Sequence, residues 1–238
     1  MTRHTADTSP MVYARVAGLA YLTIIVSGIF AEFVVRQSLL VPGDAGATAA
    51  NILASESLYR LGMAGDLLML LADVVVAVAL YVLFREVSKG LALLAAFLRL
   101  AQGAVLGANL IHVYVPLLLL GSGTGYLGAL GPDQLEALAL LHLNAHAYGY
   151  AIGLVFFGAH CAVMGYLVLR SGYVPRVLGI LLVLAAAGYL IDSFARTLLA
   201  NYAEFETVLG LVVLVPAFVG ELAFALWLLV KGVRVQGV

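Results

Sequence analysis

Residues 142–170 read HLNAHAYGYAIGLVFFGAHCAVMGYLVLR, and this stretch decides the fold. From Tyr148 to Leu169 it contains no Asp, Glu, Lys or Arg, and about 20 apolar residues in a row suffice to cross a bilayer as an α-helix. Steps of three and four residues along a helix share one face. On that face lie His142, His146, Gly149, Gly153, Phe156 and His160. The stretch therefore predicts a transmembrane helix with a histidine-bearing face, on which glycines let a neighbouring helix approach closely.

The rest of the chain shares this apolar character. Of its 238 residues, 64% are hydrophobic and 11% are charged, against roughly 45–50% and 25% in ordinary soluble domains. The mean hydropathy is +1.09. The net charge of -1 and the lack of any Lys/Arg-rich run leave no basic surface of the kind that nucleic-acid binding needs. We expect an integral membrane protein whose surroundings are the lipid bilayer and which binds no nucleic acid.

Six stretches are long and apolar enough to span a bilayer. They cover approximately residues 11–36, 58–84, 91–120, 132–170, 176–199 and 207–230. The fourth exceeds the thickness of one bilayer, so its first part, up to Leu143, is expected at the membrane interface. The predicted fold class is an all-α bundle of six transmembrane helices. It forms a single domain over residues 11–231, between a disordered N-terminal tail over residues 1–10 and a C-terminal tail over residues 232–238.

Lys and Arg residues are distributed unevenly between the two sides of this six-span arrangement. One side has Arg3, Arg15, Arg85, Lys89, Arg170, Arg176, Lys231 and Arg234, whereas the other has Arg36, Arg60 and Arg196. By the positive-inside rule, both termini are predicted to be cytoplasmic. On the outer side, Asp44 follows a Pro-Gly pair and begins an Ala-rich run, which predicts a short interfacial helix after the first span.

Four ionisable residues are expected near the middle of the bilayer, counting about 1.5 Å per residue from the cytoplasmic helix ends. This midplane group consists of Asp73, Arg99, His160 and Glu221. Ionisable groups at this depth are costly and mark functional sites or structural pairs. In an antiparallel hairpin that turns at residues 85–89, Asp73 comes level with Arg99, which predicts an ion pair that fixes the register of two helices. The group as a whole is predicted to be either proton-responsive or structural.

A second set of polar residues is expected in the outer half of the membrane. Its candidate ligand-binding members, the outer group, are Asp66, Asn109, His112, His146, Asp192 and Arg196. The i, i+4 spacing predicts salt bridges between Asp192 and Arg196 and between Glu32 and Arg36. His146 and His160 lie about 21 Å apart along their helix, so they cannot share one metal or one small ligand.

Metal binding is a further expectation for the outer half. His142 and His146 have the i, i+4 spacing of a chelating pair, and His112 and Asp192 are expected at a similar depth. These four residues are the candidate zinc ligands, and haem with His112 and His146 as axial ligands is the alternative. A lone HxxxH pair more often makes interfacial hydrogen bonds, so no cofactor is predicted ahead of that simpler role. The single cysteine, Cys161, is expected to be a buried core residue and excludes an intrachain disulfide.

Four stretches of this sequence resemble a family of bacterial multi-pass membrane proteins known only as a domain of unknown function. They are VAGLAYLTIIVSGIFAEFVVR (16–36), VPGDAGATAANILASESLYRLG (41–62), LHLNAHAYGYAIGLVFFGAHC (141–161) and RSGYVPRVLGILLVLAAAGYLIDSF (170–194). The resemblance implies a single domain in a bacterial inner membrane, with no soluble partner domain. It supplies no catalytic residue.

Three functions stay open at this point. In the first, a polar cavity open to the outer face binds or transports a small molecule or a lipid, with proton coupling through the midplane group and with a homodimer packed through glycines. In the second, a metal- or haem-dependent intramembrane enzyme activates water against a lipid-like substrate. The sequence has no P-loop, G-x-S-x-G or HExxH motif, which removes the simplest enzyme classes. In the third, the protein is a structural membrane scaffold.

Overall fold

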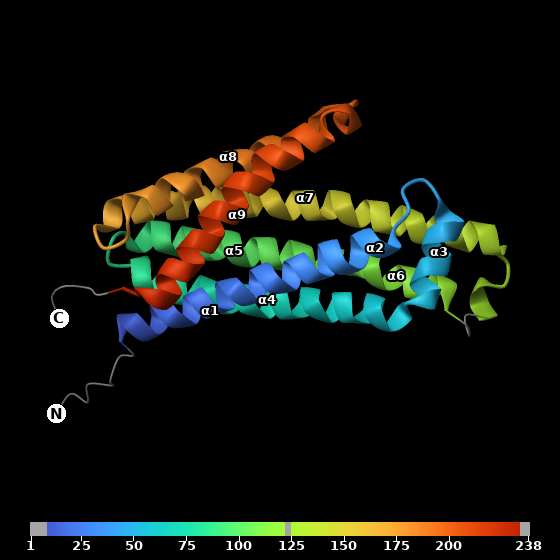
Figure 1. Ribbon diagram of the computed structural model, residues 1–238, viewed down its shortest axis with the longest axis horizontal. Helices are drawn as coiled ribbons and strands as arrows, with labels where there is room; N and C mark the ends of the chain where they lie inside the picture. Colours follow the sequence, from blue (N-terminus) through green and yellow to red (C-terminus); the bar gives the residue numbers. More distant parts are fainter. Residues whose placement is uncertain (1–8, 122–124, 234–238) are drawn as a thin grey trace.

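The computed structural model describes residues 9–121 and 125–233, and within these ranges it is built from helices with no β-strand (Figure 1). The predicted all-α fold class is therefore confirmed. The helices are α1 (Pro10–Ile29), a π-helical turn (Phe30–Arg36), α2 (Gln37–Leu39), α3 (Ala45–Ala54), α4 (Glu56–Phe84), α5 (Lys89–Asn109), α6 (Ile111–Leu120), α7 (Pro132–Ser171), α8 (Arg176–Leu198) and α9 (Glu206–Val230), with 3₁₀ turns at Gly125–Leu127 and Tyr202–Glu204.

Five helical stretches of the described residues are long and apolar enough to cross a membrane. They are Pro10–Leu39, Glu56–Phe84, Lys89–Leu120, Pro132–Ser171 and Arg176–Leu198, and they match the first five predicted spans. The sixth predicted span corresponds to α9, which has 25 residues and includes the shorter apolar segment Ala217–Val230. The count of six and the cytoplasmic placement of the termini stay predictions.

The two predicted tails overlap the described residues only slightly. Residues 1–8 and 234–238 lie outside the described part of the chain. Within the overlap, Pro10 already belongs to the first turn of α1, where proline is favoured because its missing N–H has no partner to lose. The helix therefore begins one residue earlier than predicted.

The long helices lie roughly side by side along the long axis of the molecule (Figure 1). Contacts join α1 to α4, α4 to α5, α5 to α7 and α7 to α8. Helices α8 and α9 pack on each other and diverge from α7 toward the loop that joins them, and α9 then crosses back to α1. The beginning of α1, the end of α9 and the α4–α5 and α7–α8 turns lie at one end of the bundle, the inner end, and α3 lies at the opposite, outer end.

Local sequence signals explain where several helices begin and end. The Asp44 side chain accepts a hydrogen bond from the Ala47 N–H at 2.8 Å and so caps α3, which confirms the short helix predicted after the first span. Helix α7 begins with Pro132 and ends before Gly172, whose φ of 72° is the left-handed conformation typical of a helix C-terminus. The connection Gly172–Pro175 is short enough to return α8 antiparallel to α7.

Glycines set the closest helix contacts. A Cβ atom on Gly165 of α7 would lie 2.8 Å from the carbonyl oxygen of Gly179 in α8, and a Cβ on Gly179 would lie 2.9 Å from the carbonyl oxygen of Gly165. On the face identified from the sequence, Gly149 packs against Asn109 and Gly153 packs against Leu106, both in α5. The predicted close packing at Gly149 and Gly153 is confirmed, and it brings the histidine-bearing face of α7 against α5.

Candidate functional site

Arg99 of α5 is the centre of the midplane group. Its side chain is completely buried, at 0% exposure. The guanidinium Nη2 lies 2.6 Å from the Asp73 carboxylate of α4, and Nη1 donates to the Tyr21 hydroxyl of α1 at 3.0 Å. The predicted Asp73–Arg99 ion pair is confirmed. Because an unpaired charge in a low-dielectric interior costs several kcal/mol, this pair holds α4 and α5 together. The hydrogen bond to Tyr21 joins α1 to them.

His160 of α7 completes this cluster. Its Nδ1 lies 2.8 Å from the Ala95 carbonyl oxygen, which identifies Nδ1 as the protonated nitrogen. Its Nε2, 3.2 Å from Arg99 Nη1, is then free to accept from the guanidinium. Both ring nitrogens are engaged, and among the described residues His160 has no hydrogen bond to Asp73 or Glu221. The ring positions Arg99.

Glu221 of α9 stands apart from the other three midplane residues. Its carboxylate accepts a hydrogen bond of 2.6 Å from the Tyr189 hydroxyl of α8. The contact between Tyr189 and Glu221 was not predicted from the sequence. The midplane group thus divides into an Asp73–Arg99–His160 cluster and a separate Tyr189–Glu221 contact.

Arg36 is the last residue of the π-helical turn (Phe30–Arg36), immediately before α2. Its Nε donates to Glu32 at 2.7 Å, which confirms the predicted local salt bridge. Its Nη1 and Nη2 donate to the two oxygens of Asp66 in α4, at 2.6 and 3.2 Å. The wider π-helical turn changes the direction of the side chains that follow it, so Arg36 reaches α4. A regular 3.6-residue repeat gives no hint of this bidentate pair.

The Asn109 side chain at the end of α5 holds His146 of α7. Its Nδ2 donates to the His146 carbonyl oxygen at 2.9 Å and lies 3.0 Å from His146 Nδ1. Nδ1 also lies 3.4 Å from the Asn109 backbone carbonyl oxygen, to which it would donate if it were protonated. Because the contact with the amide is shorter, we assign Nδ1 as the acceptor and place the imidazole proton on Nε2. A Cβ at Gly149 would overlap the Asn109 amide. The glycine therefore makes room for the group that orients the histidine.

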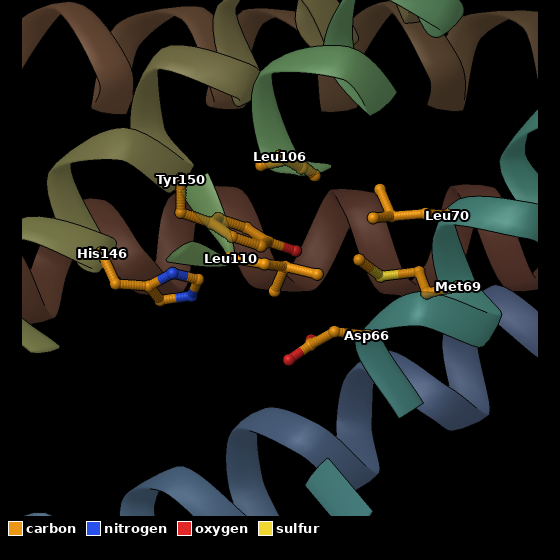
Figure 2. A pocket seen from close by; sticks show the side chains of 7 residues that line it. All are labelled: Asp66, Met69, Leu70, Leu106, Leu110, His146 and Tyr150. Atoms are coloured by element: carbon orange, nitrogen blue, oxygen red, sulfur yellow. The ribbon is translucent and has the colours of Figure 1, made fainter. Parts of the chain in front are cut away.

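A cavity of about 10 Å³ lies between α4, α5 and α7. It is lined by Asp66, Met69, Leu70, Leu106, Leu110, His146 and Tyr150. Figure 2 shows the Asp66 carboxylate, the His146 ring and the Tyr150 phenol directed toward the same space. His146 Nε2 is buried and has no hydrogen-bond partner among the described residues. Since about one water needs some 10–15 Å³ and two to four polar partners, this pocket is suited to one small polar group.

Tyr150 belongs to this pocket although sequence reasoning did not select it. It lies four residues after His146, and positions i and i+4 share one face of a helix. The spacing that linked the histidines would therefore also have found Tyr150 if tyrosine had been included among the candidate polar residues.

Asp192 and Arg196 of α8 are joined indirectly. In place of the predicted direct salt bridge, Arg196 Nη2 donates to Glu206 at 2.8 Å and to the Tyr202 hydroxyl at 2.9 Å. That hydroxyl in turn donates to Asp192 at 2.7 Å. Burial, followed by the hydrogen bond to Asp192, raises the pKa of Tyr202 to about 12. The prediction failed because the loop after α8 folds back and inserts Tyr202 between the two charges.

Replacing Tyr202 by phenylalanine tests this bridge. The Tyr202→Phe variant is expected to lose about 1 kcal/mol of unfolding free energy, measured by denaturant titration in detergent. Because the raised pKa keeps the hydroxyl protonated well above pH 10, the difference from wild type should be constant between about pH 6 and pH 9. The control is Tyr166→Phe, whose ring is 48% exposed and which should match wild type. Equal stability of both variants would show that the bridge contributes nothing.

The four candidate metal ligands occupy three different places. His112 of α6 and His142 of α7 face each other with their Nδ1 atoms 3.0 Å apart. His146 is held by Asn109, and Asp192 is bonded to Tyr202. In the described ranges, no group of three or more His, Cys, Asp or Glu side chains is placed to hold one metal ion. The structure thus places the four candidate ligands as a histidine pair and two residues with other partners, and metal binding stays a prediction.

Comparison with known proteins shows which family the chain resembles. A family model described as "Domain of unknown function (DUF4386)" matches residues 16–232. An uncharacterized protein of the archaeon Archaeoglobus fulgidus is 31% identical to this chain over 174 residues, which cover 73% of this chain and 85% of that protein. No solved structure matches the chain. The likeness thus includes an archaeal protein.

Proposed function

The chain belongs to the DUF4386 family, and we propose that it is a multi-pass membrane protein that binds a small polar molecule from the outer side of the membrane in the Asp66–His146–Tyr150 pocket. The single observation that carries the proposal is the unpartnered Nε2 of His146 at this cavity, on a side chain that is only 6% exposed. A buried polar group without a hydrogen bond costs about 1–3 kcal/mol. A ligand that accepts from Nε2–H recovers this energy.

The three polar groups of the pocket define the chemistry of the ligand. His146 offers an N–H, because Asn109 occupies its other nitrogen. Asp66 offers carboxylate oxygens whose position is fixed by the bidentate Arg36, and Tyr150 offers a hydroxyl. A group that both accepts and donates hydrogen bonds satisfies all three. We therefore propose water, a hydroxyl or an amino group as the part of the ligand that enters the cavity.

The placement of the pocket favours binding over passage through the protein. Between the pocket and the inner end of the bundle lie the Arg99 cluster and an apolar core that includes Val76, Phe84, Leu167 and Phe224. A transport pathway would have to break the buried Asp73–Arg99 pair. Because both nitrogens of His160 are engaged, we assign this cluster a structural role and do not include proton coupling in the proposal.

Six spans with both termini in the cytoplasm of the cell complete the proposal. The excess of Lys and Arg on the side of the α4–α5 and α7–α8 turns supports this orientation. In this orientation, the outer end of the bundle, which carries α3, faces away from the cytoplasm. The pocket then lies in the outer half of the membrane. The short α3, capped by Asp44, then lies at the outer interface.

Labelling of an introduced cysteine tests access to the pocket. Cys161, the single cysteine, is 1% exposed, so Cys161→Ser gives a cysteine-free background. In this background, Met69→Cys places a thiol in the pocket, and Val76→Cys places one in the inner core at a site with 0% exposure. With 2-aminoethyl methanethiosulfonate added to membrane vesicles of each orientation, Met69→Cys should react from the side opposite the termini, at least about tenfold faster than Val76→Cys.

A second variant separates the pocket from general membrane permeability. Adding His146→Phe to the Met69→Cys background replaces the polar ring that faces the cavity, and labelling is expected to slow to the rate of the Val76→Cys control. Equal labelling rates of Met69→Cys and Val76→Cys, or a faster rate from the side of the termini, would contradict a pocket reached from outside.

A further inference from the structure

The histidine pair His112 and His142 lies outside the pocket and has no role in the proposed function. His112 is in the first turn of α6 and His142 is in the first third of α7. Both side chains are partly exposed. Their Nδ1 atoms are 3.0 Å apart, and the ring centroids are 5.1 Å apart with a 38° tilt between the planes. The two rings are therefore joined by a hydrogen bond, in which one Nδ1–H donates to the other Nδ1, between two helical elements.

The distance between the two nitrogens agrees with metal coordination. A metal–imidazole bond is about 2.0–2.1 Å, so two such nitrogens lie about 2.9 Å apart at a right angle and about 3.3 Å apart at a tetrahedral angle. The observed 3.0 Å falls between these values, and among divalent first-row metals Cu²⁺ binds a given imidazole site most tightly. Rotation about χ2 of histidine is soft, and a metal ion would replace the hydrogen bond between the rings, with each imidazole then protonated at Nε2.

We propose that His112 and His142 form a binding site for a divalent transition-metal ion, with Cu²⁺ preferred and water completing the coordination. Two imidazoles are fewer ligands than a closed structural site has. The partial exposure of both rings leaves the remaining positions open to water. Neutral imidazole is the ligand form, and neither ring is bonded to a carboxylate in the described residues.

A metal ion bound by this histidine pair would join α6 to α7. The chain changes from α5 to α6 at Leu110, and Pro116 within α6 removes one internal hydrogen bond. A metal held by His112 and His142 would fix α6 to α7 at this break. His112 is three residues after Asn109, and His142 is four residues before His146, so the metal would brace the two segments that carry the Asn109–His146 contact.

Copper titration of the purified full chain without a polyhistidine tag tests the proposal. Wild-type protein should bind one Cu²⁺ per chain, with the nitrogen hyperfine pattern of two imidazoles in electron paramagnetic resonance. His112→Ala and His142→Ala should each weaken binding at least about tenfold, as expected for loss of one of two ligands. The chain has five histidines, and His4→Ala serves as the control that should bind as wild type does.

Glutamine variants, which keep the approximate size of the side chain, distinguish loss of a copper ligand from misfolding. His112→Gln and His142→Gln preserve the size of the partly exposed groups and should lose copper while keeping the elution volume of wild type. Absence of stoichiometric copper in wild type, or full binding by the His112→Gln/His142→Gln double variant, would overturn the proposal. The Met69→Cys labelling described above uses neither histidine, so the metal site and the pocket can fail independently.

Discussion

Arg99→Leu is expected to destabilise the protein by about 3–5 kcal/mol, because it leaves the Asp73 carboxylate buried without its cation. Arg99 is fully buried and is bonded to Asp73, Tyr21 and His160. Its loss therefore removes contacts to α1, α4 and α7 together. The measurement is the free energy of unfolding in detergent, supported by the yield of protein in the membrane.

Two further variants separate the ion pair from a general effect of arginine removal. Arg60→Leu breaks the Glu56–Arg60 pair, whose side chains are 45% and 59% exposed, and should change stability by less than about 1 kcal/mol. The double variant Asp73→Leu/Arg99→Leu removes both charges and should recover part of the loss. Wild-type stability of Arg99→Leu would show that the pair does not hold the helices together.

Gly165→Ala is the second substitution with a large expected effect, about 1–3 kcal/mol of lost stability. The added Cβ would lie 2.8 Å from the Gly179 carbonyl oxygen and 3.1 Å from the Val183 backbone nitrogen. Backbone atoms of α8 cannot rotate away as a side chain can, so α7 and α8 must separate. Thermal unfolding of the purified protein measures the loss.

Gly103→Ala is the matched control for this helix contact. A Cβ on Gly103 of α5 meets no atom within 4 Å, and alanine favours a helix over glycine by about 0.5–1 kcal/mol. The control variant should therefore equal or exceed wild type in stability. If Gly165→Ala behaves in the same way, the close approach of α7 to α8 is not needed for the fold.

Several contacts within one hairpin or one helix could be predicted from the sequence, although the Asp192–Arg196 bridge within α8 was predicted wrongly. A short turn fixes how the residues of α4 and α5 align, so counting along the helices was enough to pair Asp73 with Arg99. The Glu32–Arg36 bridge follows from helical periodicity, and the start of α3 follows from Asp44 as its cap. In each of these cases, residues close together in the sequence determine the relative positions of the two groups in contact.

Contacts that depend on irregular backbone or on helices distant in sequence could not be predicted. The π-helical turn at Phe30–Arg36 directs Arg36 to Asp66, and the loop after α8 inserts Tyr202 beside Asp192. Tyr189 reaches Glu221 only because α9 packs on α8. The Asn109–His146 contact likewise depends on how α5 packs on α7. The candidate site was therefore recognised by its residues, but its partners required the structure.

The unequal helices give the protein two different heights in a bilayer. Helix α7 has 40 residues and α8 has 23, about 60 Å and 34 Å in length, whereas the hydrocarbon layer is about 30 Å thick. Because α8 and α9 diverge from α7 (Figure 1), the longer side at α7 and the shorter side at α8 and α9 contact separate sets of lipid chains. Lipid chains beside α8 and α9 can match the protein directly, and those beside α7 must stretch unless the helix leaves the layer near His142. Tilting of the whole bundle relieves the same mismatch, so the thickness of the host membrane would set the depth of the histidine pair relative to the headgroups.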